Sequence, residues 1–582
     1  MRVTLKQAGQ ADRVLPAHQG QTILSFLVNQ GLYLDAPCAG RGHCGKCRVK
    51  VSGRLSPPDE KERKAIEPGG GVRLACQTRL EGDVVLEIAA EARFSSVKGL
   101  GESEPYEVDS PLKLTDFDIL DRQDNTDLMT KRGLKRASPL VLNQLAILDA
   151  SREAGHGLQW GDELLKVLPR GQAPAELLAA AVDIGTTGLA VAILDVKRGE
   201  VLAQATALNP QTACGGDVIS RITWAAGGPD QQARLQELVL GGLAGLILET
   251  AGEARRRNIM SVLISGNTTM IYLLAGIQPR GLAQAPYRPA VIGSLDLSHL
   301  AEKMYLDPAA KVLTAPNISA YVGGDISAGM LAVGLKKIPG TVLYIDIGTN
   351  GEIVLSHQGR LAATSCAAGP ALEGMNIMRG QRATPGAIDA FSLNENYSFK
   401  YSTIADAPPT GICGSGLIDL TAALVERGLI NKTGRLKAPQ DVPASVPWLP
   451  GLKEGRLVID GDVFFDQKDV RQVQLAKGAI AAGMEMLLDR FKLGFNDLDE
   501  IIIAGAFGFH LKPGSLRTIG LIPKDYQGPV RFVGNAALAG AVRMALTPNA
   551  IEELNGLAAE TTVLELGFEP QFQTVFLRHL GF

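Results

Sequence analysis

The sequence predicts a multidomain protein of mixed α/β and α+β architecture. Its 582 residues exceed what one hydrophobic core accommodates. Four of its seven cysteines fall within the first 76 residues, and an Asp-Ile-Gly-Thr motif between apolar runs occurs twice among its 66 glycines. We therefore expect a small cysteine-bearing domain at 1–92, a linker at 93–125, a small middle domain at 126–176 and a large domain in two halves at 177–582.

The composition narrows the classes of partner. The chain is 46% hydrophobic and 20% charged, with a formal net charge of -3. This balance predicts neither nucleic acid nor a membrane as a partner. The beginning of the chain is polar, so no secretory signal is expected, and the longest apolar stretch, at 238–248, is too short to span a bilayer and predicts a buried helix. The sequence predicts a cytoplasmic protein.

The N-terminal region has the pattern of a small mixed β-grasp domain. Residues 2–5 and 84–88 alternate between apolar and polar, residues 48–51 predict a further strand, and residues 21–29 have helical spacing. A second short helix is expected after Pro57-Pro58, with acidic residues in its first turn.

The cysteine spacing in this region predicts a [2Fe-2S] cluster. The loop Cys38-Ala-Gly-Arg-Gly-His-Cys44-Gly-Lys-Cys47 supplies three thiolates, and Cys76 supplies a fourth. The loop's glycines free the backbone to wrap an inorganic core. A structural zinc ion is the alternative, but a zinc ribbon normally has two CxxC pairs and this chain has one. The pattern resembles [2Fe-2S] ferredoxins, with one extra residue in the first gap compared with the plant-type spacing.

Residues 95–125 are charged and rich in turn formers, which is typical of a linker that lets the first domain move. Beyond it, leucines recur at helical spacing from Leu140 to Leu148. This pattern predicts a small domain, and the sequence indicates no role for it.

The large domain begins with a pattern of strand, glycine turn and strand that recurs about 160 residues later. Glycine at each turn permits backbone N–H groups to approach phosphate oxygens, threonine hydroxyls add donors, and the aspartates offer hard oxygens for Mg²⁺ or its waters. Either hairpin alone is a weak signal, whereas two such loops can grip a polyphosphate between them. The candidate ligands are Asp183, Gly185, Thr186 and Thr187 in the first hairpin and Asp346, Gly348, Thr349 and Asn350 in the second.

This pair of hairpins resembles the acetate kinase, sugar kinase, actin and heat-shock chaperone ATPase superfamily. Three further strings follow in the order that the superfamily has: Tyr321-Val-Gly-Gly324-Asp325 and Val533-Gly-Asn535-Ala-Ala resemble its connecting helices, and Ile501-Ile-Ile-Ala-Gly505-Ala-Phe-Gly508 resembles its adenosine motif. The resemblance implies a two-lobed actin-like or sugar-kinase-like ATPase domain, with Gly324, Gly505 and Gly508 near the nucleotide and Asp325 or Asp346 orienting the attacking water. Gly414 and Ser415 open a predicted helix whose N–H groups are a further candidate nucleotide contact. The chain contains no GxxxxGK[ST] sequence, which excludes a P-loop, and no well-placed GxGxxG.

Over nearly its full length the chain resembles the reductive activators of corrinoid proteins. Local strings carry this resemblance: Asn209-Pro-Gln, Gly216-Asp217-Val-Ile-Ser-Arg221, Ser265-Gly-Asn-Thr-Thr-Met270 and Ser365-Cys-Ala-Ala-Gly-Pro-Ala-Leu-Glu-Gly374. The resemblance implies ATP- and Mg²⁺-dependent reduction of cob(II)amide to cob(I)amide, a corrinoid protein as acceptor, a separate low-potential electron donor and a homodimer. Some members carry C-terminal [4Fe-4S] modules, which this sequence lacks.

Two alternatives stay open at the level of sequence. Activators of 2-hydroxyacyl-CoA dehydratases share the ATPase fold and hold a [4Fe-4S] cluster between subunits, and Cys366 resembles one of their ligands, although Cys413 is a poor match for the second. A redox-regulated small-molecule kinase, or a scaffold without catalysis, is the other alternative.

Overall fold

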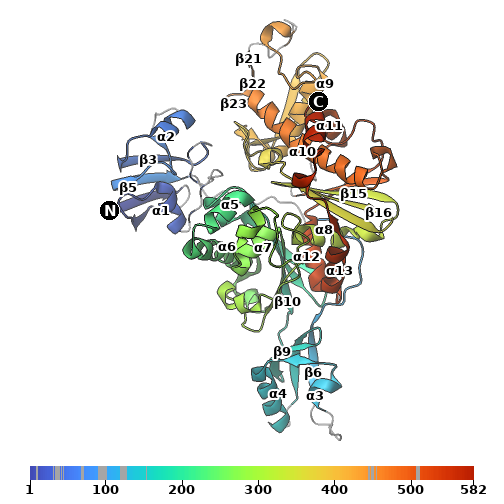
Figure 1. Ribbon diagram of the computed structural model, residues 1–582. Helices are drawn as coiled ribbons and strands as arrows, with labels where there is room; N and C mark the ends of the chain where they lie inside the picture. The colour runs from blue at the N-terminus through green and yellow to red at the C-terminus, as the bar shows by residue number, and fades with distance from the viewer. Residues whose placement is uncertain are drawn as a thin grey trace.

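The computed structural model describes residues 1–7, 11–30, 32, 34, 40, 42, 45–66, 71–88, 101–117, 127–151, 154–442, 446, 451–453, 455–505 and 511–582. Two lobes form the centre of the molecule (Figure 1). The N-terminal domain lies to one side of them, and a small sheet projects at the opposite end from the upper lobe.

The N-terminal domain is a five-stranded mixed sheet in the order β2-β1-β5-β3-β4. Its strands are β1 (Arg2–Gln7), β2 (Arg13–Pro16), β3 (Arg48–Leu55), β4 (Val72–Leu74) and β5 (Leu80–Ile88), and its helices are α1 (Ile23–Asn29) and α2 (Glu60–Ala65). β1 and β5 run parallel, and the other pairs are antiparallel. The alternating strands predicted from the sequence therefore bury one side in a core with Phe26, Leu27 and the thiol of Cys47.

A four-stranded sheet in the order β6-β8-β9-β7 forms the projecting domain. Its elements are β6 (Leu112–Phe117), α3 (Leu128–Lys131), β7 (Arg136–Ala137), α4 (Pro139–Ser151), β8 (Gly155–Trp160) and β9 (Glu163–Pro169). β6 lies inside the segment that the sequence predicted as linker. Its short alternation is hidden among charged residues, and pairing with β8 along its whole length stabilises it.

The first lobe is built on a sheet in the order β12-β11-β10-β13-β14. Its strands are β10 (Leu178–Ile184), β11 (Gly188–Asp195), β12 (Glu200–Leu208), β13 (Ile259–Gly266) and β14 (Lys311–Thr314). Its helices are α5 (Val218–Ala225), α6 (Pro229–Arg256), α7 (Thr268–Ala275) and α8 (Gly324–Val333), with short 3-10 turns η1 (Pro210–Ala213), η2 (Pro279–Ala283), η3 (Ser298–Leu300), η4 (Glu302–Met304) and η5 (Leu335–Lys337).

Among the described helices, α6 is the one whose length and composition would suffice to cross a membrane. Val239, Leu243 and Ile247 on this helix are fully buried against the sheet of the first lobe. The apolar stretch is thus the buried core helix that the sequence predicted.

The second lobe repeats the design with a sheet in the order β25-β24-β15-β16-β17-β26. Its strands are β15 (Thr341–Ile347), β16 (Gly351–His357), β17 (Arg360–Cys366), β24 (Glu500–Ala504), β25 (Val530–Gly534) and β26 (Thr562–Val563). Its helices are α10 (Gln467–Arg490), α12 (Ala536–Leu546), α13 (Ala550–Glu560) and α14 (Phe572–Arg578), with 3-10 turns η6 (Pro370–Glu373), η10 (Phe495–Asp497) and η12 (Leu566–Phe568).

The top of this lobe holds two small three-stranded sheets, β19-β18-β20 and β21-β22-β23. They consist of β18 (Ala387–Leu393), β19 (Phe399–Thr403), β20 (Gly411–Ile412), β21 (Leu452–Lys453), β22 (Arg456–Asp460) and β23 (Val463–Asp466), with helices α9 (Gly414–Glu426) and α11 (Pro513–Ile519) and turns η7 (Ile404–Asp406) and η8 (Pro439–Asp441).

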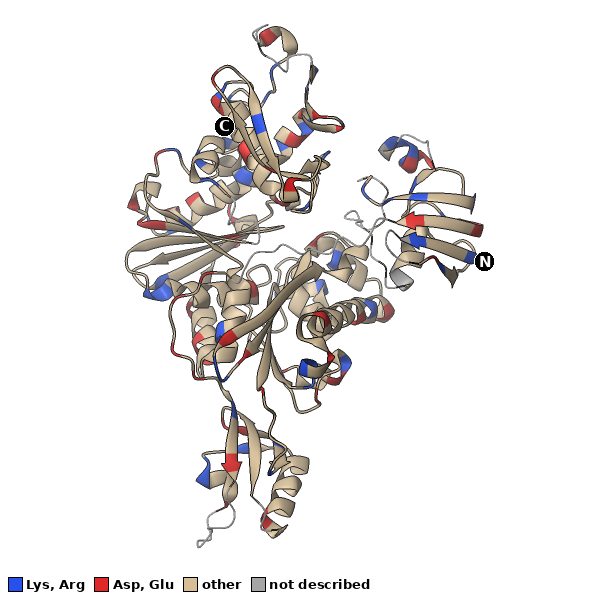
Figure 2. Cartoon of the chain, turned by 180° about the vertical axis from the view of Figure 1, so that it is seen from behind, with Lys and Arg blue, Asp and Glu red and all other residues tan. Residues whose placement is uncertain are grey.

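Helices α8 and α12 join the lobes beneath the cleft. They approach so closely that a Cβ on Gly540 would lie 2.1 Å from the carbonyl oxygen of Ala328. Glycine is required there because any side chain would push the helices apart. These are the two strings that resembled connecting helices, and the two-lobed prediction is confirmed. Charges of both signs are interspersed over all the domains (Figure 2), in line with the balanced composition.

Candidate functional site

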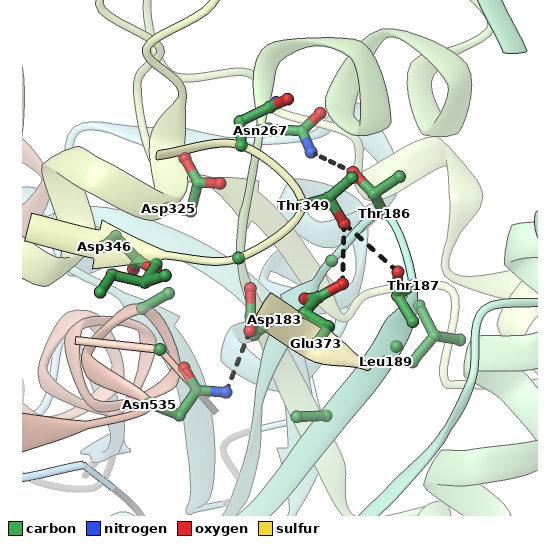
Figure 3. Close-up of a pocket in the computed structure, with 18 of the residues that line it drawn as sticks. Asp183, Thr186, Thr187, Leu189, Asn267, Asp325, Asp346, Thr349, Glu373 and Asn535 are labelled. Carbon is green, nitrogen blue, oxygen red and sulfur yellow. Dashed lines mark hydrogen bonds between the residues drawn. The ribbon is translucent and has the colours of Figure 1, made fainter. Parts of the chain in front are cut away.

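A cleft of about 250 Å³ lies between the turns of the two hairpins. The hairpin β10–β11 forms one wall and the hairpin β15–β16 the other (Figure 3), and α8 and α12 each contribute a lining residue, Asp325 and Ala537. The cleft brings together eight of the predicted hairpin residues, namely Asp183, Gly185, Thr186, Thr187, Asp346, Gly348, Thr349 and Asn350. Asp325 and Gly505 also line it.

Each turn is closed by a hydrogen bond from its glycine N–H, the first turn is one residue longer than the second, and the two turns touch each other. The N–H of Gly185 donates to the carbonyl of Gly188 at 2.9 Å, and the N–H of Gly348 donates to that of Asn350 at 3.0 Å. Across the cleft the hydroxyl oxygens of Thr187 and Thr349 lie 3.4 Å apart, although 162 positions separate them in the sequence. Donors from both lobes therefore face one space, as the repeat predicted.

The first turn is supported from behind by two side chains. Asn209 Nδ2 donates to the carbonyl of Gly185 at 2.8 Å. The guanidinium of Arg221 donates to the carbonyls of Thr186 and Gly215 and is completely buried, and this desolvation lowers its pKa to about 9. Because both groups bind carbonyl oxygens, they orient the turn without occupying the cleft.

Three aspartates converge on the cleft, and their environment favours the protonated form. Burial raises the pKa of Asp183 to about 6, against the hydrogen bonds from Asn535 and Ser265. Burial and the charge of Asp183 raise the pKa of Asp325 to about 7, and burial with the charges of Asp325 and Asp183 raises that of Asp346 to about 8. A cation among these groups would relieve both the desolvation and the repulsion.

The donor set suits Mg²⁺ shared with phosphate. Within the described part of the chain, no three His, Cys, Asp or Glu side chains are grouped to hold a metal ion by themselves. Mg²⁺ usually keeps several waters and binds one or two carboxylates together with substrate phosphates. The aspartates of the cleft fit that mode, with the nucleotide completing the coordination.

Sequence reasoning missed several residues of the cleft. Glu352 stands directly opposite Asp346 in the β15–β16 ladder, and burial raises its pKa well above the usual value. Counting the register across the turn could have revealed it. Glu373 accepts a hydrogen bond from Thr349 Oγ1 at 3.1 Å. Asn267 and Asn535 belong to strings already quoted for the resemblance, and the structure adds their contacts: Asn267 donates to Thr186 Oγ1 at 3.0 Å, and Asn535 donates to Asp183 Oδ2 at the same distance.

Other predicted contacts lie elsewhere. Gly324 does not line the cleft, and its N–H donates to Asn317 Oδ1 at 3.1 Å. Gly414 and Ser415 begin α9 as expected but also lie outside the cleft lining, since Gly414 packs on the carbonyl of Leu372 and Ser415 Oγ donates to the carbonyl of Asp389. Their contact with the nucleotide stays a prediction. Gly508 falls outside the described residues.

The N-terminal domain provides a second candidate site. Cys47 and Cys76 are buried there, whereas Cys38 and Cys44 fall outside the described residues. Gln77 Nε2 donates to Cys76 Sγ at 3.3 Å and to the carbonyl of Gly40 at 2.6 Å. Hydrogen bonds to sulfur and glycines with positive φ (Gly40, Gly42 and Gly45) are what a loop around a [2Fe-2S] cluster requires.

Cys366 and Cys413 are placed as ordinary core residues. Their Sγ atoms donate to the carbonyls of Gly351 and Ile388, and burial raises the pKa of both thiols. Each thiol thus has a hydrogen-bond acceptor within its own domain.

Comparisons with known proteins bear on the whole chain. The family described as the C-terminal domain of RACo, the ASKHA domain, matches residues 340–582. The RACo middle region matches residues 178–338, and a 2Fe-2S iron-sulfur cluster binding domain matches residues 6–81. The chain is 30% identical to the corrinoid activation enzyme RamQ of Eubacterium limosum. The alignment is 594 positions long and covers 97% of this chain and 96% of that protein. The chain belongs to the family of reductive activators of corrinoid proteins.

Two further relatives agree with this membership. A Co(II) methylated amine-specific corrinoid protein reductase of Methanosarcina barkeri is 24% identical over 443 residues, which cover 69% of this chain and 76% of that one. A solved structure named reductive activator for corrinoid, iron-sulfur protein has a TM-score of 0.72 at 30% identity and covers 100% of this chain and 98% of that chain. The predicted family, the [2Fe-2S] cluster and the ATPase domain that uses ATP with Mg²⁺ are confirmed for this activator.

Proposed function

We propose that this chain uses ATP to drive an electron from its [2Fe-2S] domain to the cob(II)amide of a corrinoid protein, giving cob(I)amide for methyl transfer. The proposal rests on one observation: the same chain carries a cysteine loop and two facing turns suited to bind phosphate. The relatives named for corrinoid activation support the choice of acceptor.

The energetics explain why an ATPase is needed. Plant-type ferredoxin clusters have reduction potentials of about -400 mV. An uphill transfer costs about 2.3 kcal/mol per electron for each 100 mV. Nucleotide can supply this only by favouring a state of the complex in which the cobalt is easier to reduce, or in which the electron cannot return.

The two turns and the three aspartates of the cleft have proposed tasks. The turns, with Gly185 and Thr186 on one side and Gly348 and Thr349 on the other, bind the phosphates. Asp183 binds Mg²⁺ or its waters. Asp346 or Asp325 orients the attacking water, because a carboxylate with a pKa near the working pH accepts a proton well.

The remaining assignments are proposals from the resemblance and the fold. We infer that a separate low-potential protein reduces the cluster and that the activator is a cytoplasmic homodimer. We also infer that the small domain begins near residue 112 rather than 126, because β6 pairs with β8 in that domain's sheet. The proposed cluster ligands remain Cys38, Cys44, Cys47 and Cys76.

An anaerobic assay tests the function. The reduced holoprotein is mixed with Mg-ATP and a cob(II)amide protein, and the cobalamin spectrum is followed. We expect cob(I)amide with ATP and none without it. Absence of cob(I)amide with several corrinoid proteins, together with phosphorylation of a small molecule, would establish the kinase alternative instead.

Iron counting tests the cluster assignment. We expect about two irons per chain, lost in Cys76→Ser and retained in the matched control Cys366→Ala. Two additional irons that disappear in Cys366→Ala would instead favour a cluster held between subunits.

A further inference from the structure

One side chain of the cysteine loop contacts the ATPase domain. Lys46 lies directly before Cys47, and its Nζ donates to the carbonyl of Ile377 at 3.0 Å and to that of Gly380 at 3.1 Å. More than 330 positions separate the partners in the sequence. An ammonium with two carbonyl acceptors fixes the position of the loop, since each charge-assisted bond is stronger than a neutral one.

The receiving carbonyls belong to a compact segment whose ends reach the nucleotide cleft. Glu373 and Arg382 both line that cleft, and the segment 373–382 loops out between them. The loop closes tightly on itself, because a Cβ on Gly380 would lie 2.0 Å from the carbonyl oxygen of Gly374. The two carbonyls that hold Lys46 therefore lie within one closely packed loop whose two end residues line the cleft.

The middle of the segment is also anchored to the second lobe. The N–H of Met378 donates to Asp469 Oδ1 at 2.8 Å, and the carbonyl of Arg379 accepts from the N–H of Ile412 at the same distance. Asp469 is completely buried at the start of α10, so this anchor is shielded from water. The two carbonyls that accept from Lys46 thus belong to a segment that is fixed to the second lobe.

We propose that Lys46 docks the cysteine loop on the segment 373–382 and thereby couples nucleotide binding in the cleft to the position of the [2Fe-2S] domain. Lys46 is a positioning residue in this scheme. The inference rests on the proposed binding of ATP in the cleft. Coupling between two sites is reciprocal: if nucleotide changes the docking, then loss of docking changes the affinity for nucleotide by the same factor.

The first test uses this reciprocity. Lys46→Met keeps the aliphatic stem and removes the charge and the donors. Lys50→Met is the matched control, because Lys50 lies four residues on, is 62% exposed and pairs with Glu87 on its own domain. Calorimetric titration of each holoprotein with a non-hydrolysable ATP analogue should show a change in Kd of about fivefold or more for Lys46→Met and none for Lys50→Met. Equal Kd values for the wild type and Lys46→Met would overturn the proposal.

The second test needs no variant. Acylation of lysines in the wild-type holoprotein, followed by mass spectrometry, should label Lys46 more slowly than Lys50, and the ratio should change when the analogue is added. Equal labelling of both lysines, or a ratio that ignores the nucleotide, would overturn the coupling. If the wild type does not bind the analogue at all, the proposed nucleotide site itself is wrong, and this result is distinct from the other two.

Discussion

The two hairpins of the ATPase domain share one sequence motif but differ in what surrounds their turns. Opposite Asp183 in the first ladder stands Ala190, whereas opposite Asp346 in the second stands Glu352. The first turn is held from behind by a buried guanidinium, and the second contacts a carboxylate through Thr349. The first turn is also one residue longer than the second. The neighbouring side chains therefore support the first turn from behind and concentrate acid groups at the second.

Neutralising the aspartates one at a time should separate the roles of the two hairpins. We expect Asp346→Asn to lower the kcat of Mg-ATP hydrolysis by about 10²–10⁴-fold, the usual contribution of a general base. Asp183→Asn should mainly weaken Mg-ATP binding. Steady-state Mg-ATP hydrolysis by the holoprotein variants measures both effects, and Asp325→Asn is assayed in parallel. If Asp325→Asn shows the larger loss of kcat, then it is the base, and if neither variant loses kcat, the second hairpin has no such role.

The support of the first turn predicts a loss of stability. Arg221→Met leaves the carbonyls of Thr186 and Gly215 buried without their donor, which should cost about 2–4 kcal/mol in the free energy of unfolding. Thermal unfolding of the holoprotein should show a clearly lower midpoint. Arg198→Met is the control, because Arg198 is 70% exposed beside Asp195. Equal midpoints for the two variants would contradict the supporting role.

The raised pKa values predict how stability depends on pH without metal or nucleotide. The folded state keeps protons on Asp183, Asp325 and Asp346 up to about pH 6, 7 and 8, whereas the unfolded chain loses them near pH 4. Between these values the native state binds more protons, so stability is greatest below about pH 4 as far as these groups are concerned and falls as pH rises toward 8. Melting curves in a metal chelator measure this, and Asp346→Asn should flatten the decline above pH 7. If stability declines as steeply above pH 7 in Asp346→Asn as in the wild type, then Asp346 does not titrate in that range.

The smallest predicted effect is on nucleotide affinity, when the threonine hydroxyl groups that meet between the turns are removed. Thr187→Val and Thr349→Val each remove one hydroxyl, worth about 0.5–1.5 kcal/mol, so the Kd for the nucleotide should rise by roughly 2–10-fold. Thr349→Val should have the larger effect, because its hydroxyl also donates to Glu373. Calorimetry measures both, and a larger effect for Thr187→Val would reverse the comparison.

Local patterns predicted much of this protein. The hairpins, the buried helix within 229–256 and the order of the domains follow from residues that are neighbours in the sequence, where periodicity and turn chemistry act directly. The sequence did not predict β6, because this six-residue strand among charged neighbours is stabilised by pairing with β8, about 40 residues later. The sequence did not indicate what packs against Gly414 and Ser415 at the start of α9, because Leu372 and Asp389 lie more than 25 positions away.

The sequence by itself determined which chemistry this chain can hold, because thiolates, glycine turns and aspartates are local requirements of a cluster and of a phosphate. Only the tertiary structure decided which groups share a site. Asn267, Glu373 and Asn535 reach the cleft from three separate elements, and the burial that raises the pKa values of its aspartates exists only when both lobes close around them. The contact of Lys46 with the segment 373–382 has the same origin, since nothing near either residue in the sequence indicates that they meet.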